Sequence, residues 1–255
     1  MNLNALFRVS GPGPLFRRFP LFVLGSLLLG VLLTSCQDHL SPSPTPSTIT
    51  LATGLLAPIG VDADATGRVW VTEAGTGKNN DGRVSIISNG TVIPAITGFA
   101  SIIFQGSVEG LNHLMFADGV LYILGPNSIL YKANVASFKT GDTPLLAQNI
   151  PSEDIGACVK AQTAAGIVTD NPDKDSHIYQ MTVGPSGDLF FADAAANVIV
   201  RRSKATGALS IVANIPGIAN PTPVGPPFIQ GVPTGLVFDG QNLLVSTLIG
   251  FPFPA

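Results

Sequence analysis

The sequence predicts an all-β fold built from one repeated unit. Its composition is the first indication: 11% of the 255 residues are charged, whereas 28 are glycine and 21 are proline. Such a composition suits short strands joined by tight turns better than it suits helices. The second indication is a pattern that recurs along the chain: an apolar strand, a turn with glycine, and a strand centred on an aromatic residue or leucine. We place this domain at residues 49–255, behind a leader and a polar linker.

The first 35 residues predict a lipoprotein signal peptide. They contain three arginines, no acidic residue, and an uncharged, mostly apolar run at Leu21–Leu33. This run is shorter than the roughly 20 residues that span a bilayer, which indicates a cleavable signal. Its ending, Leu33–Cys36 (LTSC), resembles the lipobox of bacterial lipoproteins. The resemblance implies a diacylglycerol on the Cys36 thiol; the alternative is an ordinary secretory leader with an incidental cysteine.

Residues 36–48 predict a tether, because proline alternates there with serine and threonine and no apolar face forms. We therefore expect a membrane partner through the lipid anchor, and a location in the bacterial cell envelope. Gln37 lacks the aspartate that signals inner-membrane retention in enteric bacteria, which favours an outer-membrane lipoprotein, and Asp38 leaves both the periplasmic and the surface-exposed face open. Without the leader the formal charge falls from -3 to about -6, which argues against nucleic acid as a partner.

Three copies of the two-stranded unit share one register, and a fourth, looser copy shares it approximately, with one more residue after its glycine. The first and third copies align without a gap at an offset of 120 residues, and each ends in a carboxylate, Glu73 or Asp193. We expect these carboxylates to accept hydrogen bonds from backbone donors at the strand ends. The copies are Val61–Glu73, Leu114–Gly125, Met181–Asp193 and Leu236–Thr247, with Trp70, Tyr122, Phe190 and Leu244 at their centres.

Further apolar runs complete the unit. Four strands in each repeat are typical of a β-propeller blade. An irregular β-sandwich also offers short alternating strands, but it does not require the register to recur, and a solenoid coil is shorter than these repeats. Residues 98–110 and 150–176 lack alternation and are expected to be loop insertions. The predicted third strands are Arg83–Ile87, Ser128–Lys132 and Val198–Arg202, and the fourth strands are Thr91–Ile96, Leu145–Ala147 and Leu209–Ala213.

Seven segments of the domain carry a specific likeness: Pro58–Val61, Val69–Gly77, Gly82–Ser85, Asn171–Asp173, Phe191–Asn197, Val232–Gly235 and Leu248–Pro254. Through these segments the domain resembles the ScyD/ScyE family of secreted, propeller-like proteins. More distantly, it is similar to NHL repeats and to the six-bladed fold of calcium-dependent lactonases and phosphotriesterases. The resemblance implies six blades, of which this sequence holds about three and a half, so we expect it to be a piece of a longer chain. It implies no settled chemistry, and Ser176–Tyr179 (SHIY) departs from the family's Ser-Asn-Pro-Tyr.

Two groups of residues are candidate sites. Asn112, His113 and Gln180 stand at the entrances of the predicted innermost strands, and they form a neutral polar patch suited to a ligand or a water-filled channel. In the segment 170–175, the alternate oxygen-bearing residues Asn171, Asp173 and Asp175 could face one Ca²⁺. The alternative for this second group is a solvated acidic turn, because the glycine and glutamate of an EF-type loop are missing.

Nucleophile, phosphate-loop and zinc patterns fail on spacing or ligand number. The sequence therefore favours a binding or scaffold module for a protein, glycan or small molecule at the propeller loops, and leans away from an enzyme. The alternative is a calcium-dependent hydrolase of lactones or phosphotriesters, which depends on the distant fold likeness alone.

Overall fold

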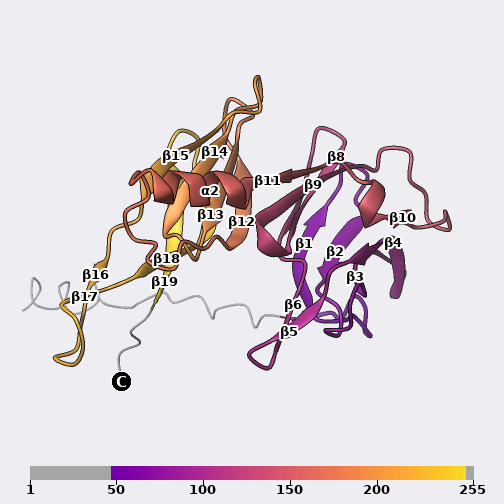
Figure 1. Ribbon diagram of the computed structural model, residues 1–255. Coiled ribbons are helices and arrows are strands. Elements are labelled where there is room, and N and C mark those ends of the chain that lie inside the picture. The colour runs from indigo at the N-terminus through magenta and orange to yellow at the C-terminus, as the bar shows by residue number, and fades with distance from the viewer. Residues whose placement is uncertain (1–46, 251–255) are drawn as a thin grey trace, which may run out of the picture. The chain divides into compact units, whose positions relative to one another are not determined.

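The computed structural model describes residues 47–250, and their fold consists mostly of antiparallel β-sheets (Figure 1). The strands belong to one compact unit that starts at Thr50. The predicted signal peptide, Cys36 and most of the tether lie outside the described residues, as does the segment 251–255. Within residues 47–250, no helix combines the length and the apolar character that crossing a membrane would take.

The first sheet is a four-stranded antiparallel blade with one extra strand at its edge. Its order is β1-β2-β3-β4-β10, and β10 runs parallel to β4. The strands are β1 (Pro58–Ala63), β2 (Val69–Glu73), β3 (Gly82–Ser88), β4 (Thr91–Phe99) and β10 (Leu145–Leu146).

The second and third sheets each contain four antiparallel strands. The second sheet comprises β7 (Leu114–Ala117), β8 (Val120–Gly125), β9 (Ile129–Asn134) and β11 (Ser152–Asp154). The third comprises β12 (Ile178–Val183), β13 (Leu189–Asp193), β14 (Val198–Arg202) and β15 (Leu209–Asn214).

A long hairpin follows the third sheet and supplies the two strands of a fourth blade, β18 (Gly231–Phe238) and β19 (Leu243–Ile249). Shorter elements occupy the connections between the sheets. They are the hairpins β5 (Ile102–Phe104) with β6 (Ser107–Glu109) and β16 (Ile218–Ala219) with β17 (Phe228–Ile229), the helix α2 (Ile155–Ala164), and the 3₁₀ turns η1 (Pro126–Ser128) and η2 (Ala147–Asn149).

The predicted repeat is confirmed at the level of individual strand pairs. Val61 pairs with Val71 in the first sheet, and Met181 pairs with Phe191 in the third, which is the same pairing 120 residues later. The turn glycines Gly67 and Gly187 both have φ +81°, a conformation that glycine adopts without steric cost. The two segments are therefore matching hairpins of separate sheets.

The sheets are arranged as the blades of a propeller. The innermost strands β1, β7, β12 and β18 contact one another in that order. Apolar cores fill the spaces between successive sheets, with Trp70 and Leu114 in the first, Met181 and Phe191 in the second, and Leu236 in the third. Each sheet thus buries its face against the next blade, and the all-β propeller of about three and a half blades is confirmed.

Two details of the prediction are wrong. Leu145 and Leu146 do not form the fourth strand of the second blade, because they pair with Ile96 and Thr97 of the first blade. The fourth strand of the second blade is β11, which lies in the segment predicted to be a loop. This strand is short and polar, and its Glu153 pairs with Lys132 at 2.9 Å and with Arg202 at 2.7 Å, so ion pairs fix it where apolar alternation is absent.

The two predicted insertions contain regular structure. The first holds the β5–β6 hairpin, and the second holds α2 after β11. Asp154 caps this helix, because its side chain accepts a hydrogen bond from the backbone N–H of Ala157 at 2.8 Å. Ile155 and Val159 anchor α2 in the core between the second and third blades.

Candidate functional site at the entrance of the inner strands

A cavity of about 440 Å³ lies where the inner strands begin. Each blade contributes the residue that stands two positions before the first residue of its repeat copy. These four equivalent residues are Ile59, Asn112, Tyr179 and Thr234. We call this cavity the axial cavity, because all four blades meet in it.

The four equivalent residues sit at irregularities in the inner strands. The pairing register of β1, β12 and β18 shifts at Ile59, Tyr179 and Thr234. In the second blade, Asn112 N–H donates to Leu124 O, and Leu124 N–H donates back to His113 O, so two residues again face one partner. Such β-bulges redirect side chains, and here the bulged residue of each blade lines the same cavity.

The loops next to the inner strands add two ionisable side chains to the cavity. Glu109 comes from β6, and His177 directly precedes β12. The sequence did not reveal either residue as part of the site. Glu109 lies in an insertion without alternation, and the one signal for His177 was its departure from the family pattern at this loop.

The three residues of the predicted polar patch have different positions. Asn112 lines the axial cavity. The side chain of Gln180 reaches the next blade instead, where its Oε1 accepts a hydrogen bond from the backbone N–H of Leu236. His113 is largely buried, and this burial lowers the pKa of its imidazole, with a smaller opposing effect from Asp62.

Asn112 joins the second blade to the third. Its Nδ2 donates to the backbone oxygen of Ile178 at 3.1 Å and lies 3.2 Å from His177 Nε2. An amide nitrogen only donates, so in this contact His177 Nε2 has the role of acceptor. The contact and the bond to Ile178 together tie the start of the inner strand of the third blade to the second blade.

Asp193 supports the backbone beneath His177. Its carboxylate accepts hydrogen bonds from the backbone N–H groups of His177, Ala195 and Ala196 at 3.0 to 3.1 Å, and from Ser176 Oγ at 2.5 Å. Burial raises the pKa of Asp193, although these hydrogen bonds partly oppose the shift. The prediction that this carboxylate satisfies backbone donors is confirmed.

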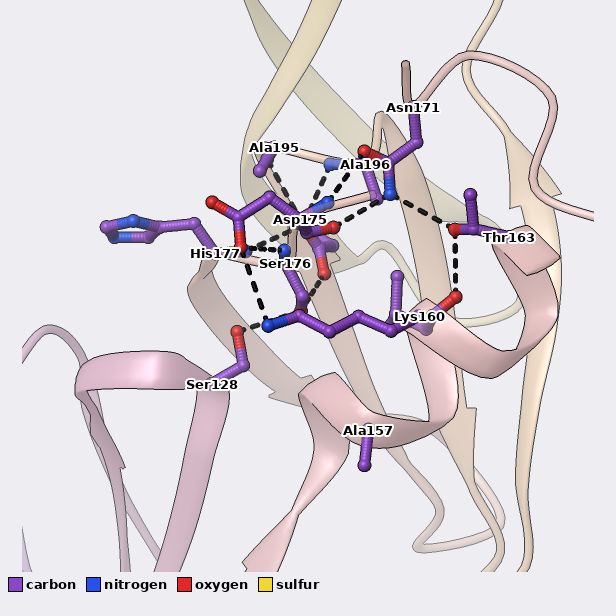
Figure 2. A network of polar contacts seen from close by, with 12 residues as sticks. Ser128, Ala157, Lys160, Thr163, Asn171, Asp175, Ser176, His177, Ala195 and Ala196 are labelled. Carbon is purple, nitrogen blue, oxygen red and sulfur yellow. Dashed lines mark hydrogen bonds and ion pairs between the residues drawn. The ribbon is translucent and has the colours of Figure 1, made fainter. Parts of the chain in front are cut away.

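Ser176, His177 and Asp193 do not form a nucleophilic triad. Figure 2 shows the imidazole of His177 directed away from the network that holds Ser176. Ser176 is itself buried and is hydrogen-bonded to Ser128 Oγ at 2.9 Å. The arrangement therefore fixes the loop in place and exposes no hydroxyl for attack.

The predicted calcium ligands are not directed at one point. Asn171 uses its amide within the loop: Oδ1 accepts from Asp175 N–H at 3.0 Å, and Nδ2 donates to Asp175 O at 2.7 Å and to Thr163 Oγ1 at 3.1 Å (Figure 2). The carboxylate of Asp175 accepts from Ser176 N–H and lies 3.6 Å from Lys160 Nζ. Asp173 lines a separate groove. Over residues 47–250, no group of three or more His, Cys, Asp or Glu side chains is placed to hold a metal ion.

Comparison with known proteins gives structural neighbours of low identity. No family model and no curated protein matches the chain. A streptogramin B lyase structure has a TM-score of 0.43 and 16% identity, over 81% of this chain and 50% of that one. A catalytically inactive virginiamycin B lyase from Staphylococcus aureus, with quinupristin, has a TM-score of 0.35 and 16% identity, over 80% of this chain and 65% of that one. The chain thus spans half the length of the first of these neighbours, and none of these values supports an inference about activity.

Proposed function

We propose that this chain is a lipid-anchored, propeller-type binding module of the bacterial cell envelope, related to the ScyD/ScyE family, and that its ligand occupies the axial cavity. The observation that supports the binding role is the convergence of one equivalent side chain from each of four blades on one cavity. A propeller serves many proteins as a platform for such sites. The lining mixes hydrogen-bonding groups with apolar side chains, as small-molecule sites commonly do.

The chemistry of the lining favours binding over catalysis. Its histidine is hydrogen-bonded to the amide of Asn112 rather than to a hydroxyl or thiol that it could activate. Among the described residues that line the cavity, none is serine or cysteine, and Glu109 is the one carboxylate. The alternative, a calcium-dependent hydrolase, needs several oxygen ligands around one ion, whereas the described lining of the cavity offers one carboxylate.

The binding role is tested by filling the cavity. We expect a library of sugar, amino-acid, nucleoside and alkyl fragments to include members that give saturation-transfer NMR signals with the full chain. A Thr234→Trp variant should lose those signals, whereas Thr91→Trp, at an exposed position on β4, should retain them. Signals that the two variants retain equally would refute the axial cavity as a ligand site.

The hydrolase alternative has its own readout. We expect neither dihydrocoumarin nor paraoxon to be turned over by the full chain with 1 mM CaCl₂, and no calcium-dependent rise in its thermal unfolding midpoint. Turnover together with a calcium-dependent shift would replace the binding role with the hydrolase.

The lipid anchor is a separate part of the proposal, supported by the lipobox that ends at Cys36. Bacteria that express the full chain should incorporate alkyne-palmitate into it, and the label should disappear in a Cys36→Ala variant. A Cys158→Ala variant serves as the matched control, because it removes the other cysteine of the chain. Equal labelling of the two variants would contradict the anchor.

A further inference from the structure

The hairpin β5–β6 exposes three consecutive large apolar side chains. Ile102, Ile103 and Phe104 are 50%, 57% and 55% exposed. The positive φ values of Gln105 and Gly106 place a two-residue turn directly after them. Exposed apolar residues that gather in this way mark an interaction site more often than those scattered singly do.

This hairpin continues the wall of the axial cavity. Val108 and Glu109 of β6 line the cavity, and Ile102 is paired opposite Glu109. Opposite residues of an antiparallel pair share a face, and so do residues two apart on one strand, so Phe104 lies on the same face as Ile102 and Glu109. Val108, the other residue of β6 that lines the cavity, is paired opposite Ile103. Each face of the hairpin therefore joins a cavity-lining residue to exposed apolar side chains.

Other blades add large, mostly apolar side chains to the cavity wall. Ile59, Tyr179 and Leu248 come from three different blades, all three line the cavity, and all three are exposed. They share the cavity wall with the hydrogen-bonding pair of Asn112 and His177. The wall thus offers both hydrogen-bonding groups and apolar surface.

The charge of the lining restricts the polar part of a ligand. Among the described residues that form the cavity wall, none is lysine or arginine, and Glu109 is the one acidic residue. An anionic group in this cavity would meet a like charge without a counter-charge, whereas an uncharged or cationic group would not.

We propose that the axial cavity binds a small amphiphile whose polar end is uncharged or cationic and whose body is alkyl-like. The polar end meets the cavity centre at Asn112, His177 and Glu109, and the alkyl body lies along Ile102 and Phe104. This inference rests on the proposed binding function and narrows it to a class of ligand.

Calorimetric titration of the full chain with butyl, hexyl and octyl β-glucoside, each kept below its micelle concentration, tests the proposal. Affinity should rise several-fold for each two methylenes added, as expected when part of the alkyl chain is buried. Octyl sulfate should bind at least about tenfold more weakly than octyl glucoside, because its head group is an anion that approaches the carboxylate of Glu109, whereas the glucose head group is uncharged.

Two variants assign the parts of the site. Phe104→Ser should weaken the increase of glucoside affinity with alkyl chain length. Val212→Ser should not, because Val212 is an exposed apolar residue of β15 that does not line the cavity. Glu109→Gln should reduce the difference in affinity between octyl sulfate and octyl glucoside. It should leave the increase of affinity with alkyl chain length unchanged.

Three outcomes would overturn the proposal. They are an affinity that does not change with alkyl chain length, an equal effect of Phe104→Ser and Val212→Ser on that change, and tighter binding of octyl sulfate than of octyl glucoside. Phosphatidylcholine vesicles provide a further arm. Vesicle binding that Phe104→Ser abolishes, without binding of monomeric glucosides, would assign the hairpin to a bilayer and overturn the small-amphiphile site. Fragments that respond to Thr234→Trp without any alkyl preference would overturn this inference and leave the binding function intact.

Discussion

Glu73 and Asp193 occupy the same position in two blades, yet their electrostatic environments are opposite. Arg83 Nε lies 2.8 Å from Glu73 Oε1, whereas the residue paired with Asp193 at the corresponding place is Val198. Burial disfavours the charge of Glu73, but hydrogen bonds from Arg83, Ser85 and the backbone of Leu56 outweigh it and lower the pKa. At Asp193 burial dominates and raises the pKa. Replacing each carboxylate by its amide should therefore have opposite effects on stability.

Asp193→Asn should leave stability unchanged or raise it at neutral pH. Because the pKa of Asp193 is higher in the folded than in the unfolded chain, the parent chain loses stability as pH rises from the ordinary value of 3.8 through the raised value. The amide retains an acceptor for the backbone donors and should remove this loss. Urea unfolding at pH 4 and pH 7, followed by the fluorescence of the single tryptophan, Trp70, measures the difference.

Asp193→Ala provides the contrast, because it leaves the N–H groups of His177, Ala195 and Ala196 without their acceptor. We expect a loss of about 3 kcal/mol in the free energy of unfolding. If the alanine variant were as stable as the asparagine variant, the network beneath His177 would not be a stabilising one.

Glu73→Gln should destabilise the chain at neutral pH by roughly 3 kcal/mol, because it leaves the guanidinium of Arg83 beside a neutral group in a buried site. The folded-state pKa of Glu73 is lowered, so the stability it provides is present above its ordinary value of 4.5 and lost as pH falls through the folded-state value. The free energy of unfolding of the variant should therefore approach that of the parent chain at acidic pH. An equal deficit at pH 3 and pH 7 would show that the ion pair is not the cause.

The contact between the first two blades depends on the hydroxyl of Thr72. Its Oγ1 accepts from Gly60 N–H at 2.7 Å and donates to Asn112 O at 2.5 Å, so it also holds the backbone of a cavity residue. Thr72→Val keeps the shape and removes both bonds, and should cost about 2 kcal/mol. Thr91→Val, at an exposed position of β4, should change stability by less than about 0.5 kcal/mol in the same urea titration.

The sequence was sufficient to predict the inner two strands of each blade. Alternation and turn glycines are local signals, and Gly67 and Gly187 have the same backbone conformation in the structure. The outer strands were less predictable, because β11 is fixed by the ion pairs of Glu153 with residues of two other strands, and sequence order does not show such contacts.

The candidate site was predictable in part. Asn112 precedes an inner strand and was selected on that basis, but bulges decide which side chain enters the cavity, and simple alternation cannot place a bulge. Glu109 reaches the cavity from an inserted hairpin, and His177 is held there by Asp193 through its backbone. These placements arise from contacts between distant segments.

The imidazole of His113 is largely buried next to the inner strand of the second blade. Burial disfavours the charged form, so its pKa is lower in the folded chain than its ordinary value of 6.5, although Asp62 opposes part of the shift. Protonation then favours the unfolded chain, and stability should fall as pH drops through 6.5 toward the folded-state pKa. His113→Gln removes the titrating group and should flatten the unfolding free energy between about pH 5 and pH 7. A variant that retains the parent's slope over this range would assign the pH dependence to other groups.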